Sequence, residues 1–403
     1  MNYYKNHIPP GTQDYLPVEC AHKRDLEERA RRTFAAWGYD EVETPSMEYY
    51  DVFRGTVGDF EQERLFKLTD SSGRLLVLRP DLTMPLARVA ATKLANQPVA
   101  RLFYVGDAYQ FAGTPNAGGA REFAQTGVEL LGQSGPLADA EVIALAITAL
   151  KTAGLTDFQI DIGQVEFFKG LMEEAGLSPE QSEQVRLHVD DKNMLAIEML
   201  MQEAGVSGEL RNRILELPML YGGPEVLDVA DSYTGNSRSR RAIRSMRETL
   251  AVLSGYGLDE HVSIDLGMVQ SINYYSGVIF RGISQYLGYP LLAGGRYDGL
   301  MAEFDRPMAA TGFALYVKPV LIALERQGNL NGSRPVDAVA AVSAGDGAAA
   351  LAALQALRAD GLRVEQFYGE PDGLIAYARQ RGAAMALRWQ GDAYAEVWKE
   401  ERP

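Results

Sequence analysis

The length and charge of this chain limit the classes of protein to which it can belong. Its 403 residues are too many for one small domain and predict about two or three domains, each with its own core. Acidic residues outnumber basic residues by 54 to 39, and the formal net charge is −15 at pH 7. A nucleic-acid binder normally presents a basic face to phosphates, so this balance argues against tRNA as a partner.

Membrane and metal functions are also excluded. No stretch reaches the roughly 18 apolar residues of a membrane span, and the N-terminus lacks the order of a signal peptide, so we expect a cytoplasmic protein with no membrane partner. Cys20 is the only cysteine, which excludes an internal disulfide and a cysteine-rich metal site. Because the four histidines (His7, His22, His188 and His261) are scattered, we expect no metal and no cofactor.

Helix and strand patterns alternate in the first third of the chain. Apolar residues recur at helical spacing over 19–37, and a strand-like segment follows that stops at Pro45. Two longer β-rich segments, 100–111 and 121–132, are separated by the turn-rich residues 112–120. This pattern predicts an antiparallel hairpin.

The middle of the chain predicts a helical insertion between strands. A helix is expected at 138–153 and a strand at 157–163, after which residues 166–256 are rich in Glu, Leu, Met and Arg with few β-branched runs. Within them, the basic run 237–247 either contacts an anion or is simply the solvated start of a helix. Strand character returns in the segments 261–269 and 272–284. A glycine-rich passage follows at 289–300, and 310–327 reads as a strand that runs on into a helix.

The C-terminal part reads as a separate domain. Residues 328–335 have the composition of a linker, and 336–403 alternate strand with helix, which predicts a small α/β domain. The expected organisation is therefore a core domain over 1–327, with an insertion at about 166–256, followed by the linker and the C-terminal domain.

Seven short sequences carry a family resemblance. They are, in chain order, PGTQDYLP, the TP of Thr44 and Pro45, LRPDLT, RLFYVGDAYQF followed by FAQTGVELLG, INYYSGVIF, AGGRYDGL and TGFALYVKP. A single glycine-rich string would indicate no more than a tight turn, but the ordered set resembles class II aminoacyl-tRNA synthetases of the histidyl type. The resemblance implies an α+β fold, with an antiparallel sheet flanked by helices, and a homodimer interface formed by the helix and strand that end at Pro45.

The resemblance also implies a pocket for free histidine. Asp81 and Thr83 resemble the carboxylate and the hydroxyl with which the family holds the α-amino group. Gln125 and Glu129 match further pocket positions, and because they lie four apart on a predicted strand their side chains point to the same side of the sheet.

Aromatic residues match the other end of that pocket. Tyr274 and Tyr275 resemble the tyrosine pair of the family, of which we expect only Tyr275 to face inward. Tyr297 is expected to close the side-chain end, beneath the backbone of Gly294 and Gly295. An ammonium group needs carboxylate acceptors, and an imidazole needs a polar partner between aromatic walls, so the set is chemically coherent. The alternative is that these polar residues are only the wet face of a half-buried sheet.

Three positions depart from the synthetase pattern. Gln110 stands where the family has the arginine that grips the α-phosphate of ATP, and Gln270 stands where it has the histidine-specific arginine. Pro319 replaces the arginine at the start of the helix under ATP, and the adjacent Lys318 is expected to point elsewhere. If each lost cation removes about 3 kcal/mol of transition-state stabilisation, the three together remove roughly six decades of rate. The alternative is that each change is benign and compensated nearby, with Pro319 merely starting a helix.

A fold that keeps a histidine pocket but cannot use ATP is typical of one paralogue family, the regulatory subunits of ATP phosphoribosyltransferase. The resemblance implies a catalytically inactive, synthetase-like subunit in a hetero-oligomer. Its partner would be the short-form catalytic subunit, which carries out the first step of histidine biosynthesis, and L-histidine would be the feedback effector. The alternatives are a histidyl-tRNA synthetase or another tRNA- or histidine-sensing paralogue.

Overall fold

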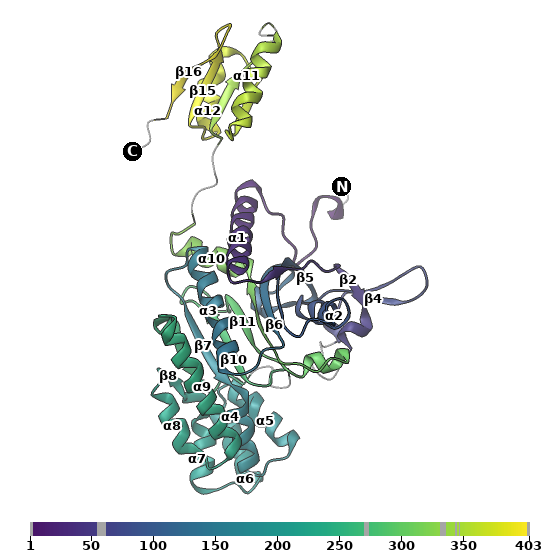
Figure 1. Cartoon of the computed structure of the whole chain (residues 1–403), viewed down its shortest axis with the longest axis vertical. Helices are drawn as coiled ribbons and strands as arrows, with labels where there is room; N and C mark the ends of the chain where they lie inside the picture. Colours follow the sequence, from purple (N-terminus) through teal and green to yellow (C-terminus); the bar gives the residue numbers. More distant parts are fainter. Residues whose placement is uncertain are drawn as a thin grey trace. The chain divides into compact units, whose positions relative to one another are not determined.

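The computed structural model describes residues 3–54, 62–269, 274–330, 336–342, 345 and 347–400. The chain divides into two compact units, of which the first contains His22–Leu330 and the second Asn331–Pro403 (Figure 1). In the described part of the chain, no helix has the length and apolar character needed to cross a membrane.

A nine-stranded sheet forms the centre of the first unit. In sheet order its strands are β1 (Asp40–Glu41), β5 (Ala100–Thr114), β6 (Ala120–Leu131), β12 (Ala310–Tyr316), β11 (Leu292–Arg296), β10 (Val278–Ile283), β7 (Gln159–Gln164), β9 (Val262–Asp265) and β8 (Tyr221–Gly222). Only the β1–β5 and β7–β9 pairs are parallel. The mostly antiparallel sheet expected from the sequence is confirmed.

The predicted hairpin is made by β5 and β6, whose register pairs Tyr104 with Gly127. Strand β5 continues to Thr114, so the connection is shorter than the turn-rich sequence suggested. A short 3₁₀ turn over Pro115–Ala117 ends at Gly118, which adopts a φ of 65° that favours glycine. The hairpin is therefore long enough for both of its strands to border one cavity.

Helices cover one face of this sheet. They are α1 (Pro17–Ala36), α3 (Pro136–Ala153) and α10 (Val317–Arg326). Their fully buried side chains, such as Phe34 and Leu150, form one core with Val128 and Leu130 of β6. Since side chains alternate along a strand, the residues between these point to the other face. There α2 (Thr83–Thr92) packs over a second core that includes Tyr104.

Beside the large sheet lies a small antiparallel one, β2 (Met47–Tyr49), β4 (Leu75–Leu78) and β3 (Lys67–Thr69), in the order β2-β4-β3. Glu48 in the middle of β2 is buried and accepts a 2.6 Å ion-pair contact from Arg88 of α2. This contact fastens the small sheet to the helix that borders the cavity.

The helical insertion is confirmed. Its helices are α4 (Val165–Glu174), α5 (Pro179–Asp190), α6 (Met194–Glu203), α7 (Gly208–Glu216), α8 (Val226–Tyr233) and α9 (Ser237–Gly255). The basic run is the start of α9, because the side chain of Asn236 caps the helix by accepting from the backbone N–H of Arg238 and Ser239. Arg238 forms ion pairs with Glu166 and Glu173, so this run is engaged with the chain itself.

The second unit is a small α/β domain, as expected. Its sheet has the order β14 (Val364–Phe367), β13 (Ala338–Ala341), β15 (Met385–Trp389) and β16 (Tyr394–Lys399), and its helices are α11 (Gly347–Ala359) and α12 (Leu374–Gln380). The first three strands are parallel, whereas β16 pairs antiparallel with β15. Strand β16 was not predicted from the sequence.

Candidate functional site

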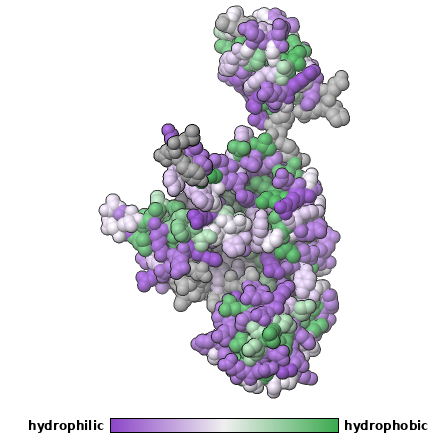
Figure 2. Space-filling view, turned by 180° about the vertical axis from the view of Figure 1, so that it is seen from behind, coloured by the Kyte–Doolittle hydropathy of each residue, from purple (hydrophilic) through white to green (hydrophobic). Residues whose placement is uncertain are grey.

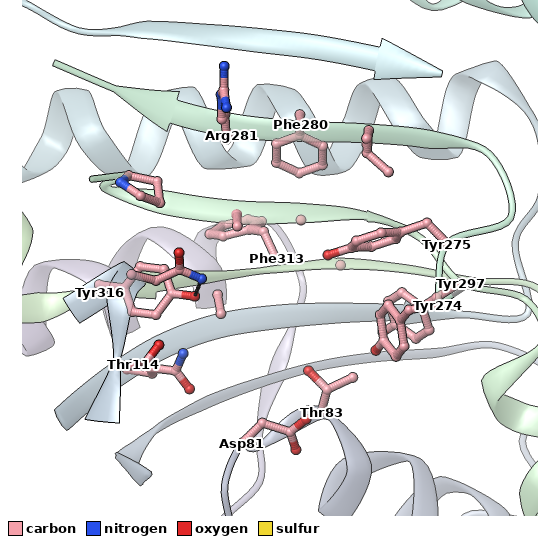
Figure 3. A pocket seen from close by; sticks show the side chains of 18 of the residues that line it. Asp81, Thr83, Thr114, Tyr274, Tyr275, Phe280, Arg281, Tyr297, Phe313 and Tyr316 are labelled. Atoms are coloured by element: carbon pink, nitrogen blue, oxygen red, sulfur yellow. Dashed lines mark hydrogen bonds between the residues drawn. The ribbon is translucent and has the colours of Figure 1, made fainter. Parts of the chain in front are cut away.

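A cavity of about 820 Å³ lies on the face of the large sheet that carries α2. This volume falls within the range of about 300 to 1,000 Å³ that is usual for small-ligand sites. Tyr274, Tyr275 and Tyr297 stand at one end of the cavity, Tyr316 and Thr114 at the other, and Asp81 with Thr83 along one side (Figure 3). All seven residues predicted for a histidine pocket line it, together with Gln110: Asp81, Thr83, Gln125, Glu129, Tyr274, Tyr275 and Tyr297.

Gln125 and Glu129 both lie on β6 and line the same cavity, as expected for residues on one face of the strand. Their exposed fractions are only 5% and 2%, so the interpretation of a wet sheet face is wrong. Burying a polar group is costly unless it has partners, which makes two such groups in one cavity a sign of a binding site. The side-chain Oε1 of Gln125 has no hydrogen-bond partner among the described residues.

Glycines make room for the polar groups. Gly312 of β12 stands opposite Glu129 in the sheet register. A Cβ atom on Gly312 would lie 1.9 Å from Oε2 of Glu129 and 2.4 Å from the carbonyl oxygen of Val128. A Cβ on Gly294 would lie 2.4 Å from the carbonyl oxygen of Gly312. The Glu129 carboxylate therefore fits because Gly312 has no side chain, and Gly294 allows the neighbouring strand to approach Gly312 closely.

The Glu129 carboxyl group is the polar centre of the cavity. Its Oε1 accepts a 2.7 Å hydrogen bond from the Thr83 hydroxyl, and its Oε2 accepts one from the Tyr297 hydroxyl. Burial raises the pKa of Glu129 to about 8, although both hydrogen bonds oppose this shift. A carboxyl group with so high a pKa gains from a cationic ligand, which would favour its ionised form.

Asp81, which is half-buried, is the second acid in the cavity. It stands just before α2, and its Oδ1 accepts a 3.1 Å hydrogen bond from the backbone N–H of Met84 in the first turn. Burial raises the pKa of Asp81 to about 7. Two acidic groups in one buried space, each with a raised pKa, form a site that is selective for positive charge.

The tyrosine pair differs from expectation, because both of its members line the cavity. Tyr274 and Tyr275 meet edge to face at 4.9 Å between ring centroids, and Tyr274 stacks on Tyr297 at 5.3 Å. The prediction that only one could face inward assumed a strand, whereas β10 begins at Val278 and the pair lies in the turn before it. In a turn, successive side chains are not forced to opposite sides.

The positions that depart from the synthetase pattern are not all brought together. Gln110 lines the cavity, where its Nε2 donates to the carbonyl oxygen of Pro80 at 3.3 Å and its Oε1 has no partner among the described residues. Pro319 is buried in the first turn of α10, and neither it nor Lys318 belongs to the cavity wall. Gln270 lies outside the described residues.

Sequence reasoning missed several wall residues. Tyr104, Phe123 and Tyr316 are buried aromatic side chains that line the cavity. Tyr104 pairs with Gly127 across the hairpin, and Gly127 lies two residues before Glu129, so strand alternation alone could have placed the Tyr104 side chain on the cavity face.

The cationic wall residues are Arg64 and Arg281. Arg281 contacts Asp161 at 3.2 Å and Asp265 at 3.1 Å, so these acids balance its charge. The described residues contain no cluster of side chains that could hold a metal ion.

Comparison with known proteins shows the family to which the chain belongs. The family model described as histidyl-tRNA synthetase matches residues 11–320. An ATP phosphoribosyltransferase regulatory subunit from Acetivibrio thermocellus is 45% identical over 100% of this chain and 97% of its own length. The relative of the same name from Symbiobacterium thermophilum is 42% identical over 95% of this chain and 97% of its own.

Solved structures agree with this placement. A crystal structure described as an ATP phosphoribosyltransferase regulatory subunit/histidyl-tRNA synthetase from Bacillus halodurans superposes with a TM-score of 0.84 and 32% identity, covering 96% of this chain and 99% of the other. Histidyl-tRNA synthetase from Nostoc sp. PCC 7120 has a TM-score of 0.82 at 20% identity, covering 97% and 96% of the two chains, and shares the fold. This chain therefore belongs to the family of ATP phosphoribosyltransferase regulatory subunits, which are built on the histidyl-tRNA synthetase fold.

Proposed function

We propose that this chain is a cytoplasmic, catalytically inactive regulatory subunit of ATP phosphoribosyltransferase. In this role it is required by the separate short catalytic subunit for the first step of L-histidine biosynthesis, and it receives L-histidine as the feedback effector in the cavity beside α2. The observation that carries the proposal is the pair of acids that line one cavity, the half-buried Asp81 and the buried Glu129, in a chain whose relatives are named as regulatory subunits.

The cavity suits an amino acid with a second polar, planar end. The α-ammonium group has three acceptors available in the carboxylate of Asp81, the hydroxyl of Thr83 and the unpartnered Oε1 of Gln125. The imidazole would then lie against Glu129 and the stacked tyrosines, which supply one polar partner and flat apolar walls. This assignment gives the α-ammonium group and the imidazole of histidine complementary groups of the protein.

The same cavity is poorly equipped for ATP chemistry. Adenylate formation requires fixed cations at the phosphorus that accumulates negative charge. The neutral Gln110 stands at one such position, and Arg281 is engaged by Asp161 and Asp265. We therefore expect binding of histidine without its activation.

We propose that a second copy of the chain packs against the exposed outer face of the small sheet. Met47 and Tyr49 of β2 are 56% and 47% exposed, and Leu68 of β3 is 41% exposed. The cross-strand register places Leu78 opposite Met47 and Leu76 opposite both Tyr49 and Leu68, so one face of this sheet is apolar across its three strands. The face begins two residues after Pro45, and symmetric pairing is the commonest way to cover such a surface.

Two measurements on the purified chain test the proposal. Calorimetry should show binding of L-histidine, while histidine-dependent exchange of pyrophosphate into ATP should be absent. Exchange at about 1 to 1,000 per second, the range of ordinary enzymes, would instead make the chain a histidyl-tRNA synthetase.

Light scattering tests the proposed dimer. It should show two copies in the parent chain and a shift toward one copy in Tyr49→Lys, which places a charge on the apolar face.

A further inference from the structure

The outer side of the helical insertion has an unusual number of exposed apolar side chains. Figure 2 shows that the insertion, the lower part of the molecule, carries hydrophobic side chains among its hydrophilic ones on the face in view. On α5 and α6 four such residues are exposed, with fractions of 47%, 37%, 68% and 63%; they are Leu187, Met194, Leu195 and Met199. We call these four residues the α5–α6 face.

Helical periodicity explains why these residues cannot serve the core. Ile197 and Met201 of α6 are fully buried, and Leu195 and Met199, two residues away from Ile197 on either side, point to the opposite side of the helix. Helix α6 is therefore apolar on two sides, of which the insertion itself buries one. An apolar outer side on a solvent-exposed helix marks an interaction surface.

The charged residues around the α5–α6 face limit the kinds of partner that can bind it. Residues 180–203 contain six acidic residues against the two basic residues Arg186 and Lys192. A second copy docking there would bring like charges together, and an anionic membrane surface or a nucleic acid would be repelled. A different protein whose apolar contact surface is bordered by lysine and arginine fits both the apolar residues and the acidic surroundings.

The insertion is also joined to the cavity. Nζ of Lys169 on α4 donates to the backbone carbonyl oxygen of Tyr275 at 3.4 Å and pairs with Glu166 at 3.4 Å. Glu166 in turn accepts from Arg238 of α9. Helices α4 and α9 of the insertion are thus connected by direct contacts to a wall of the cavity.

We propose that the α5–α6 face is the surface on which this chain docks the catalytic phosphoribosyltransferase subunit, through an apolar patch of that subunit bordered by basic residues. This inference rests on the proposed function, because the partner it names is the one that the proposed function requires. It adds the location of the contact and the charge of the partner's surface.

The experiment measures assembly of the full chain with the purified catalytic subunit by light scattering and calorimetry. Leu195→Ser and Met199→Ser, alone and combined, are compared with the control Met219→Ser, which removes a methionine that is 71% exposed on the same insertion outside α5 and α6. We expect the combined variant to raise the Kd of the complex at least about tenfold, and the control to leave it unchanged. Glu198→Lys should also weaken the complex, most strongly at low salt.

The controls separate failure of this inference from failure of the proposed function. Homodimer size and histidine binding should be unchanged in every variant, which shows that the fold is intact. Parent-like assembly of the combined variant would overturn the α5–α6 face while leaving the proposed function standing. Loss of the homodimer in that variant would assign the face to a second copy and overturn the inference. Absence of assembly by the parent chain would overturn both proposals.

Discussion

Replacement of Glu129 tests the chemistry of the cavity most sharply. Its carboxylate is 2% exposed and accepts hydrogen bonds from Thr83 and Tyr297. Glu129→Ala removes the carboxylate that would pair with the imidazolium form of the ligand's side chain and leaves that charge unpaired in a buried site, at a cost of about 2 to 5 kcal/mol. We expect the Kd for L-histidine to rise about 30- to 4,000-fold, and feedback inhibition to weaken with it.

Glu129→Gln is the matched control because it keeps the shape and one acceptor oxygen but removes the charge. A hydrogen bond to a charged group is worth about 1.5 to 3 kcal/mol and one to a neutral group about 0.5 to 1.5 kcal/mol, so the expected loss is roughly tenfold in Kd. Because the pKa of Glu129 is raised, its ionised form destabilises the fold, and the ligand-free Gln variant should be at least as stable as the parent above about pH 8.

Titration calorimetry with L-histidine, supported by thermal unfolding, measures both effects. An unchanged Kd in both variants would refute the assignment and move the histidine site to another part of the complex. Reduced affinity accompanied by general unfolding would also fail to support it, which is why the unfolding scan belongs to the same experiment.

Three further predictions follow from the cavity. Asp81 and Glu129 have raised pKa values, about 7 and 8, so between about pH 4 and 8 they hold protons that the unfolded chain has already released, and the ligand-free protein should lose stability as pH rises through that range. Binding of the α-ammonium group favours ionised Asp81, so histidine should bind more tightly as pH rises through about 7, with release of protons; buffer-independent heats would contradict this. Gly312→Ala places a Cβ atom 1.9 Å from a Glu129 oxygen and should weaken histidine binding, while Gly288→Ala, whose Cβ meets nothing within 4 Å, should not. Lys169→Met breaks the contact with the Tyr275 carbonyl and should reduce inhibition by histidine several-fold with little change in histidine affinity; an equal loss of both would indicate damage to the cavity rather than to its coupling.

Much of the candidate site followed from strand alternation and ordered motifs. Gln125 and Glu129 were identified by the family resemblance, and strand alternation correctly placed them on the same face. The same rule misled at Tyr274 and Tyr275, because periodicity does not reveal that these two residues lie in a turn rather than in β10. The role of Gly312 was also hidden, because it depends on a cross-strand partner 183 positions earlier in the chain, at residue 129.

In the fold, too, elements that depend on local contacts were predicted, whereas elements that depend on distant pairing were not. The amphipathic pattern of α1 and the composition of the insertion indicated helices directly, since helical contacts are local. Strand β16 escaped prediction because its place depends on antiparallel pairing with β15, which the alternation of strand and helix before it does not indicate. Pro319 was expected beside ATP, yet the direction of α10 places it away from the cavity wall.

We propose that this chain acts on the catalysis of a partner and performs none of its own. The most direct measurement titrates the purified short phosphoribosyltransferase subunit with this chain and follows product formation by absorbance, with and without L-histidine. We predict that the rate rises and saturates at a fixed subunit ratio, and that histidine lowers the activated rate by a coupling of about 1 to 3 kcal/mol, or roughly 5- to 150-fold. A rate that stays flat across the whole titration would show that this chain does not activate the catalytic subunit.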